Sequence, residues 1–162
     1  MNDKLHQINV TYHGKEDRLL LKVTTRKGDE FRIWLTRRFT GLLFGVLKTE
    51  MDKHGGIASI GTSQQTRQMF KAGAFDKAFE HEKALNFPLG EQGFLAYGIK
   101  SSSTPQGDLV LEVLPEKGMG VTMNLDKSML YMLHNLLSQG SAKAEWHQQI
   151  INLQDEASSH VH

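Results

Sequence analysis

The sequence predicts an α+β protein built from two β-β-β-α units that repeat each other. Three observations support this: a long self-match at constant offset, apolar residues that change from alternating to helical spacing, and a capping residue at the same place in each copy. A chain of 162 residues is long enough for one compact domain. We expect a pseudo-twofold pair, or one larger antiparallel sheet, with packed helices.

The self-match joins residues 18–47 to residues 108–137 without a gap, at an offset of 90, with eight of 30 positions identical. Eleven apolar positions of the first copy are apolar in the second, whereas two unrelated hairpin-and-helix units would share only a general likeness. We therefore interpret the match as an internal duplication. The eleven pairs, expected in the core, are Leu19/Leu109, Leu21/Leu111, Val23/Val113, Phe31/Val121, Ile33/Met123, Leu35/Leu125, Phe39/Met129, Leu42/Met132, Leu43/Leu133, Val46/Leu136 and Leu47/Leu137.

Alternation predicts three strands in each unit. In the first unit it covers residues 8–12, 19–23 and 31–35, with turns at "HGKED" (13–17) and "RKGD" (26–29). In the second unit the first strand carries Leu95, Tyr97 and Ile99, and a longer link, 101–108, follows. Helical spacing comes next in both units, after the N-caps Thr36 and Asp126.

The remaining segments set the domain organisation. The first unit covers 1–54, a loop and connecting helix cover 55–92, the second unit covers 93–139, and a C-terminal helix and flexible tail cover 140–162. "SQGSA" (138–142) is expected to break the chain between the second unit and the last helix. The extra middle helix spans about 63–84 and the C-terminal helix 143–154. Their apolar residues are Met69, Phe70, Phe75 and Phe79, and Trp146, Ile150 and Leu153.

Composition favours a protein of the cytoplasm. Charged residues make up 23% and hydrophobic residues 39%, and there is no cysteine, which fits a reducing compartment. The polar start "MNDKLHQ" has no apolar core of a signal peptide, and the apolar run at 41–47 is far shorter than a membrane span. We expect no membrane partner.

The two copies differ on the face opposite the predicted core. The first presents Lys22, Arg32 and Trp34, whereas the second has Glu112 at the position that matches Lys22 and Asn124 at the position that matches Trp34. Cations beside an aromatic ring on a sheet are typical of platforms that bind single-stranded nucleic acid. The alternative is that Trp34 and Leu20 lie under the 63–84 helix while Lys22 and Arg32 reach into solvent.

Arg37 and Arg38 occupy the first turn of the first helix, where cations are disfavoured by roughly 0.3–1 kcal/mol each. The free backbone N–H groups of a helix start, together with two guanidinium groups, would suit a phosphate. The alternative is that both arginines are solvated or pair with Asp29 and Glu30 across the turn.

No motif indicates catalysis, a cofactor or a metal. "KHGGIASIGTS" (53–63) lacks the Gly-Lys-Ser/Thr of a phosphate loop, and residues 80–82 point apart on a helix. His160 and His162 in a flexible tail make a poor metal site. We expect a protein that is not an enzyme, although an enzyme of unrecognised type stays open.

Two binding hypotheses therefore lead. The first is a module that binds single-stranded nucleic acid or another polyanion. The second is a protein-interaction or assembly module that uses the Met- and Phe-bearing helices to contact a partner or, as a homo-oligomer, a second copy of the chain. The duplicated plan has a loose likeness in topology to the single-strand DNA-binding regulators of the positive-cofactor and Pur types, which have four strands per unit where this chain has three. The candidate site residues are Lys22, Arg32, Trp34, Arg37 and Arg38.

Overall fold

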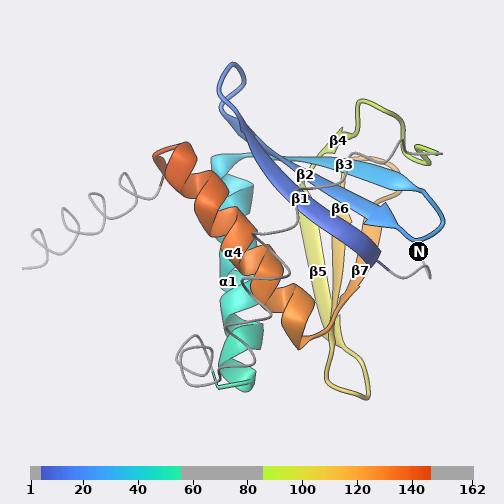
Figure 1. Ribbon diagram of the computed structural model, residues 1–162, viewed down its shortest axis with the longest axis vertical. Coiled ribbons are helices and arrows are strands. Elements are labelled where there is room, and N and C mark those ends of the chain that lie inside the picture. The colour runs from blue at the N-terminus through green and yellow to red at the C-terminus, as the bar shows by residue number, and fades with distance from the viewer. Residues whose placement is uncertain (1–4, 56–85, 147–162) are drawn as a thin grey trace, which may run out of the picture.

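The computed structural model describes residues 5–55 and 86–146, and within them the protein is α+β, as predicted (Figure 1). The predicted helix at 63–84 lies outside the described residues, as does the 143–154 helix beyond Trp146. The elements, in chain order, are β1 (Leu5–His13), β2 (Arg18–Thr25), β3 (Glu30–Leu35), α1 (Arg37–Lys53), β4 (Phe94–Leu95), β5 (Gly98–Ser103), β6 (Leu109–Leu114), β7 (Val121–Leu125) and α4 (Lys127–Lys143).

The strands form two sheets. Sheet 1 has the order β1-β2-β3-β4, and sheet 2 has the order β5-β6-β7. All neighbouring strands are antiparallel except β4, which runs parallel to β3. The parallel pair was not predicted, because it joins two strands that lie far apart in the sequence. Figure 1 shows α1 and α4 together on one side of the sheets.

One continuous core fills the space between the helices and the inner faces of the strands. The alternating apolar positions of β2, β3, β6 and β7 are all buried, which confirms the predicted inner face of both units. On α1 the prediction is wrong at Leu42, whose side chain is 49% exposed, because the apolar stripe that reaches the core consists of Phe39, Leu43, Leu47 and Met51.

The segment that enters the second unit differs from its predicted alternation. Phe94 and Ala96 point inward, and Leu95 and Tyr97 are 43% and 68% exposed. The reason is that this segment serves both sheets: Ala96 N donates to Trp34 O (2.9 Å), and Tyr97 N donates to Leu114 O (2.8 Å). The predicted single strand is therefore divided into β4 and β5, with the change of sheet between them.

Both predicted helix starts are confirmed. The Thr36 hydroxyl accepts from Phe39 N (3.1 Å), and the Asp126 carboxylate accepts from Met129 N (2.8 Å). The predicted break at 138–142 is wrong, since α4 continues to Lys143. Gly140 lies against Leu19, and a Cβ atom there would come within 3.0 Å of a Leu19 methyl group. The absence of a side chain at Gly140 thus allows α4 to pack closely on β2.

The chain after α4 is anchored to the β1–β2 hairpin. Trp146 is buried, its ring stands edge-on to Tyr12 at 6.2 Å between centroids, and its Nε1 donates to Asp17 Oδ1 (3.0 Å). The Tyr12 hydroxyl donates to the same oxygen (2.9 Å), and this hydrogen bond is the main reason that the pKa of Tyr12 is raised. The anchor holds the hairpin end of sheet 1 in place.

Two glycines, one on each helix, test the helix packing. Replacing Gly140 with valine should lower the free energy of unfolding by about 1–3 kcal/mol, because the new methyl groups overpack the contact with Leu19. Replacing Gly45, which has open space around it on α1, with alanine should raise it by about 0.5–1 kcal/mol through helix propensity. Urea denaturation measures both. A Gly140 variant as stable as the wild type would contradict this packing.

His134 should make stability depend on pH. It lies partly buried on α4, edge-on to Phe44 of α1 at 5.4 Å, and burial lowers its pKa. The unfolded chain therefore takes up the proton at higher pH than the folded chain, so the free energy of unfolding falls as pH drops below about 6.5. Denaturation of wild type and His134→Gln at about pH 7.5 and 5 measures this. An equal loss in both proteins would contradict the assignment.

Candidate functional site

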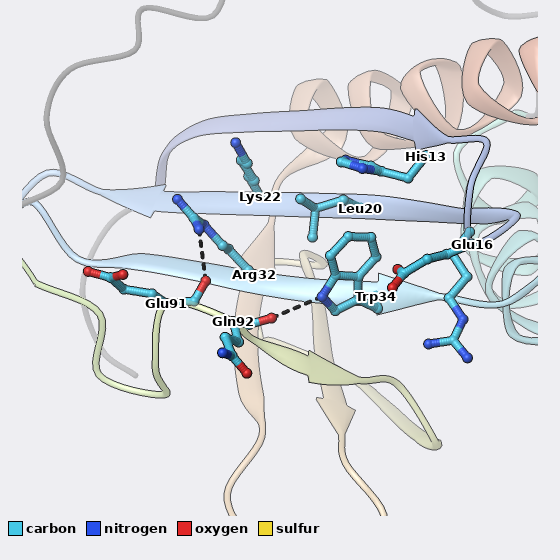
Figure 2. A pocket seen from close by; sticks show the side chains of 9 residues that line it. His13, Glu16, Leu20, Lys22, Arg32, Trp34, Glu91 and Gln92 are labelled. Atoms are coloured by element: carbon cyan, nitrogen blue, oxygen red, sulfur yellow. Dashed lines mark hydrogen bonds between the residues drawn. The ribbon is translucent and has the colours of Figure 1, made fainter.

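The outer face of sheet 1, which points away from the core, carries an open concavity of about 600 Å³ (Figure 2). We call it the sheet-1 concavity. Its sides come from three places: the strands β2 and β3, the β1–β2 hairpin, and the loop that precedes β4. The lining residues are His13, Glu16, Arg18, Leu20, Lys22, Arg32, Trp34, Glu91 and Gln92. It contains three of the five predicted site residues.

The floor of the concavity is apolar. Leu20 and Trp34 are directly opposite each other in the β2–β3 register, and Leu20 is 5% exposed. The imidazole of His13 stands edge-on to the Trp34 ring, with 4.9 Å between centroids. Trp34 Nε1 donates to the Gln92 carbonyl (2.9 Å), so the indole is held in one orientation (Figure 2). Trp34 lines the concavity and keeps part of its surface exposed.

Arg32 has a positioning role that the sequence did not indicate. Its Nε donates to the buried Glu30 carboxylate (2.6 Å), and its Nη1 donates to the Glu91 carbonyl (2.8 Å). The guanidinium also lies 5.0 Å from the centre of the Phe87 ring. The Arg32 side chain keeps 30% of its surface exposed, as the alternative interpretation in which it reaches solvent requires, but most of its contacts fasten the 86–93 loop to β3.

The close approach of this loop depends on a glycine. Gly93 has φ +72°, and a Cβ atom there would lie 2.1 Å from the Arg32 carbonyl oxygen. Any other residue would be strained and would push the loop off β3. The position of the side of the concavity that Glu91 and Gln92 form therefore depends on Gly93, Arg32 and Trp34.

Two cations of the concavity remain available. Arg18 and Lys22 make no ion pair within the described part of the chain, and both point from β2 to the outer face. Lys22 is directly opposite Arg32 and is therefore a diagonal neighbour of Trp34. Diagonal neighbours lie roughly 7–8 Å apart, within reach of long side chains. A ligand that stacks on Trp34 can thus meet the Lys22 ammonium group.

Arg37 and Arg38 do not take part in this site. Both are exposed in the first turn of α1, and neither lines the sheet-1 concavity. Of the two acids named as their alternative partners, Asp29 and Glu30, Glu30 lies at the opposite end of β3 from α1, roughly 17 Å from Leu35 along the strand. Its carboxylate binds Arg32 instead.

Five residues of the concavity were missed by sequence reasoning: His13, Glu16, Arg18, Glu91 and Gln92. Arg18 could have been found, because it alternates with Leu20 and Lys22 on the same strand face. Glu91 and Gln92 carried no such signal, since they reach β3 through contacts that span 59 and 58 residues of chain, respectively.

The described ranges, 5–55 and 86–146, contain no group of three or more histidine or acidic side chains that could hold a metal. His160 and His162 lie outside them. Within the same ranges no helix has the length and hydropathy needed to cross a membrane.

Comparison of the chain with known protein families, curated proteins and solved structures found no match. The fold and the concavity therefore carry the functional argument.

Arg32 and Arg38 provide a test of the site geometry. Arg32→Met should lower the free energy of unfolding by about 1.5–3 kcal/mol, because it leaves the Glu30 carboxylate buried without its charged partner. Arg38→Met removes an exposed cation from a helix start and should leave stability unchanged or raise it by about 0.3–1 kcal/mol. Thermal denaturation compares the two, and equal effects would contradict the role given to Arg32.

Proposed function

We propose that the protein is a non-catalytic binding module that takes single-stranded nucleic acid, or another polyanion, on the outer face of sheet 1. The observation that carries the proposal is the Trp34 ring held rigidly beside Lys22 in an open concavity. Stacking of a base on an aromatic ring contributes about 1–3 kcal/mol, and a lysine or arginine beside it binds the phosphate. The absence of cysteine supports a place in the cytoplasm.

The arrangement of the two units supports a duplicated, pseudo-twofold origin. The helices α1 and α4 each have 17 residues and begin at matching positions, Arg37 and Lys127, in the self-match of the sequence. The turn glycines Gly28 and Gly118 also match, and both have positive φ. The outer face of the second unit carries no aromatic residue on its three strands. We therefore assign binding to the first unit.

An assembly module is the second candidate, and one observation favours it. Leu95 and Tyr97, which are 43% and 68% exposed, lie where the two sheets meet, beside the Trp34 row of β3. An exposed apolar pair of this kind suits contact with a protein partner or a second copy of the chain. The helix residues on which the sequence hypothesis relied are only partly described: Met129 and Met132 are half-buried, and residues 69–79 lie outside the described ranges.

A charge-matched pair of double variants tests the binding proposal. Arg18→Ala with Lys22→Ala should weaken binding of a labelled single-stranded oligonucleotide at low salt by at least tenfold, because both cations line the concavity. Lys100→Ala with Lys117→Ala removes the same charge from sheet 2 and its β6–β7 turn, and should change affinity by less than twofold. Fluorescence anisotropy measures both.

Trp34→Leu completes the test, because it removes stacking and keeps an apolar floor. We expect a loss that corresponds to about 1–3 kcal/mol of binding free energy. Equal losses in the two double variants would show that only net charge matters. If neither DNA nor RNA binds at low salt, the proposal fails, and a dimer measured by sedimentation would then support the assembly module.

A further inference from the structure

We infer that the sheet-1 concavity holds one nucleotide unit, a single base with its adjacent phosphate groups, and not a continuous track of the strand. This inference rests on the proposed function and makes it more specific. It predicts recognition of a mononucleotide, a short oligonucleotide or a single exposed base. Three features of the concavity support it: its size, the charges at its two ends, and the small number of available cations.

The size of the concavity suits one small ligand. Its volume is about 600 Å³, which lies within the range of about 300–1,000 Å³ that is typical of sites for single small molecules. The apolar floor consists of one cross-strand pair, Leu20 and Trp34, so there is one aromatic surface on which a base can stack. The exposed ring of Tyr97, which lies near β3, does not line the concavity.

Each end of the concavity carries one acidic side chain, next to Arg18 at the Trp34 end and next to Lys22 and Arg32 at the other end. Glu16, from the β1–β2 hairpin, lies at the Trp34 end, and Glu91, from the loop before β4, lies at the Arg32 end (Figure 2). Each end is held in place: Asp17 of the hairpin accepts from Trp146, and the Glu91 carbonyl accepts from Arg32. A strand that continued beyond the concavity in either direction would bring its next phosphates toward these carboxylates, which repel them.

The available cations are too few for a track. Arg32 already binds Glu30 and the 86–93 loop, which leaves Arg18 and Lys22 for phosphate contacts. They are four residues apart on β2, roughly 13 Å, with Leu20 between them. Neutralising one or two phosphates gives a slope of log affinity against log salt of about −0.7 to −1.4 for a single strand. A continuous track would give a much steeper slope.

The test uses the full chain and calorimetry with deoxythymidine oligomers of one, two, four, eight and twenty nucleotides, each with a 5′-phosphate. We expect the affinity per site to stop rising at two nucleotides and the salt slope to stay between about −0.7 and −1.4. Affinity that keeps rising with length, or a slope steeper than about −3, would overturn the inference while leaving the proposed function standing. No binding at any length would overturn both.

Two variants sharpen the distinction. Glu16→Gln with Glu91→Gln removes the acidic side chain at each end and should make the affinity rise with length beyond two nucleotides. Arg37→Ala with Arg38→Ala removes cations that lie outside the concavity and should change the affinity of the twenty-nucleotide oligomer by less than twofold. A larger loss in the arginine variant would mean that the strand extends to the start of α1, and the inference would be wrong.

Discussion

The backbone bridge at Ala96 and Tyr97 is the constraint on which the rest of the structure depends. Ala96 donates to β3 and Tyr97 donates to β6, so two adjacent residues tie one sheet to the other. With both sheets held at this point, their inner faces and the two helices enclose a single core. The bridge also brings the 86–93 loop beside β3, because Gly93 lies only a few residues before it.

The functional face follows from this placement. Arg32 and Trp34 hold the loop through its carbonyl groups, and the loop in return orients the indole and supplies Glu91 as one end of the concavity. The other end comes from the hairpin that Trp146 anchors through Asp17. Segments that lie far apart in the sequence thus define one small site. Its geometry depends on the contacts of the 86–93 loop with β3 and on the contact of Trp146 with the β1–β2 hairpin.

Much of the fold could be predicted because its signals are local. Alternation identified β2, β3, β6 and β7, and a polar residue before each apolar helical pattern identified Thr36 and Asp126 as caps. The prediction failed where the position of a residue is set by contacts with residues far away in the sequence. Leu95 and Tyr97 alternate like an inward face but point outward, since their segment is shared by two sheets. Gly140 resembles a helix end, yet it permits close packing on Leu19.

The sequence by itself determined which face of each strand carries chemistry, because side chains in a strand alternate with period two. It therefore placed Lys22, Arg32 and Trp34 together on the outer face of sheet 1. Only the tertiary structure decided what each of them does. Arg32 binds Glu30 and a loop 59 residues away, and Arg37 and Arg38 stand apart from the concavity. These outcomes depend on long-range contacts, and neither periodicity nor residue type encodes them.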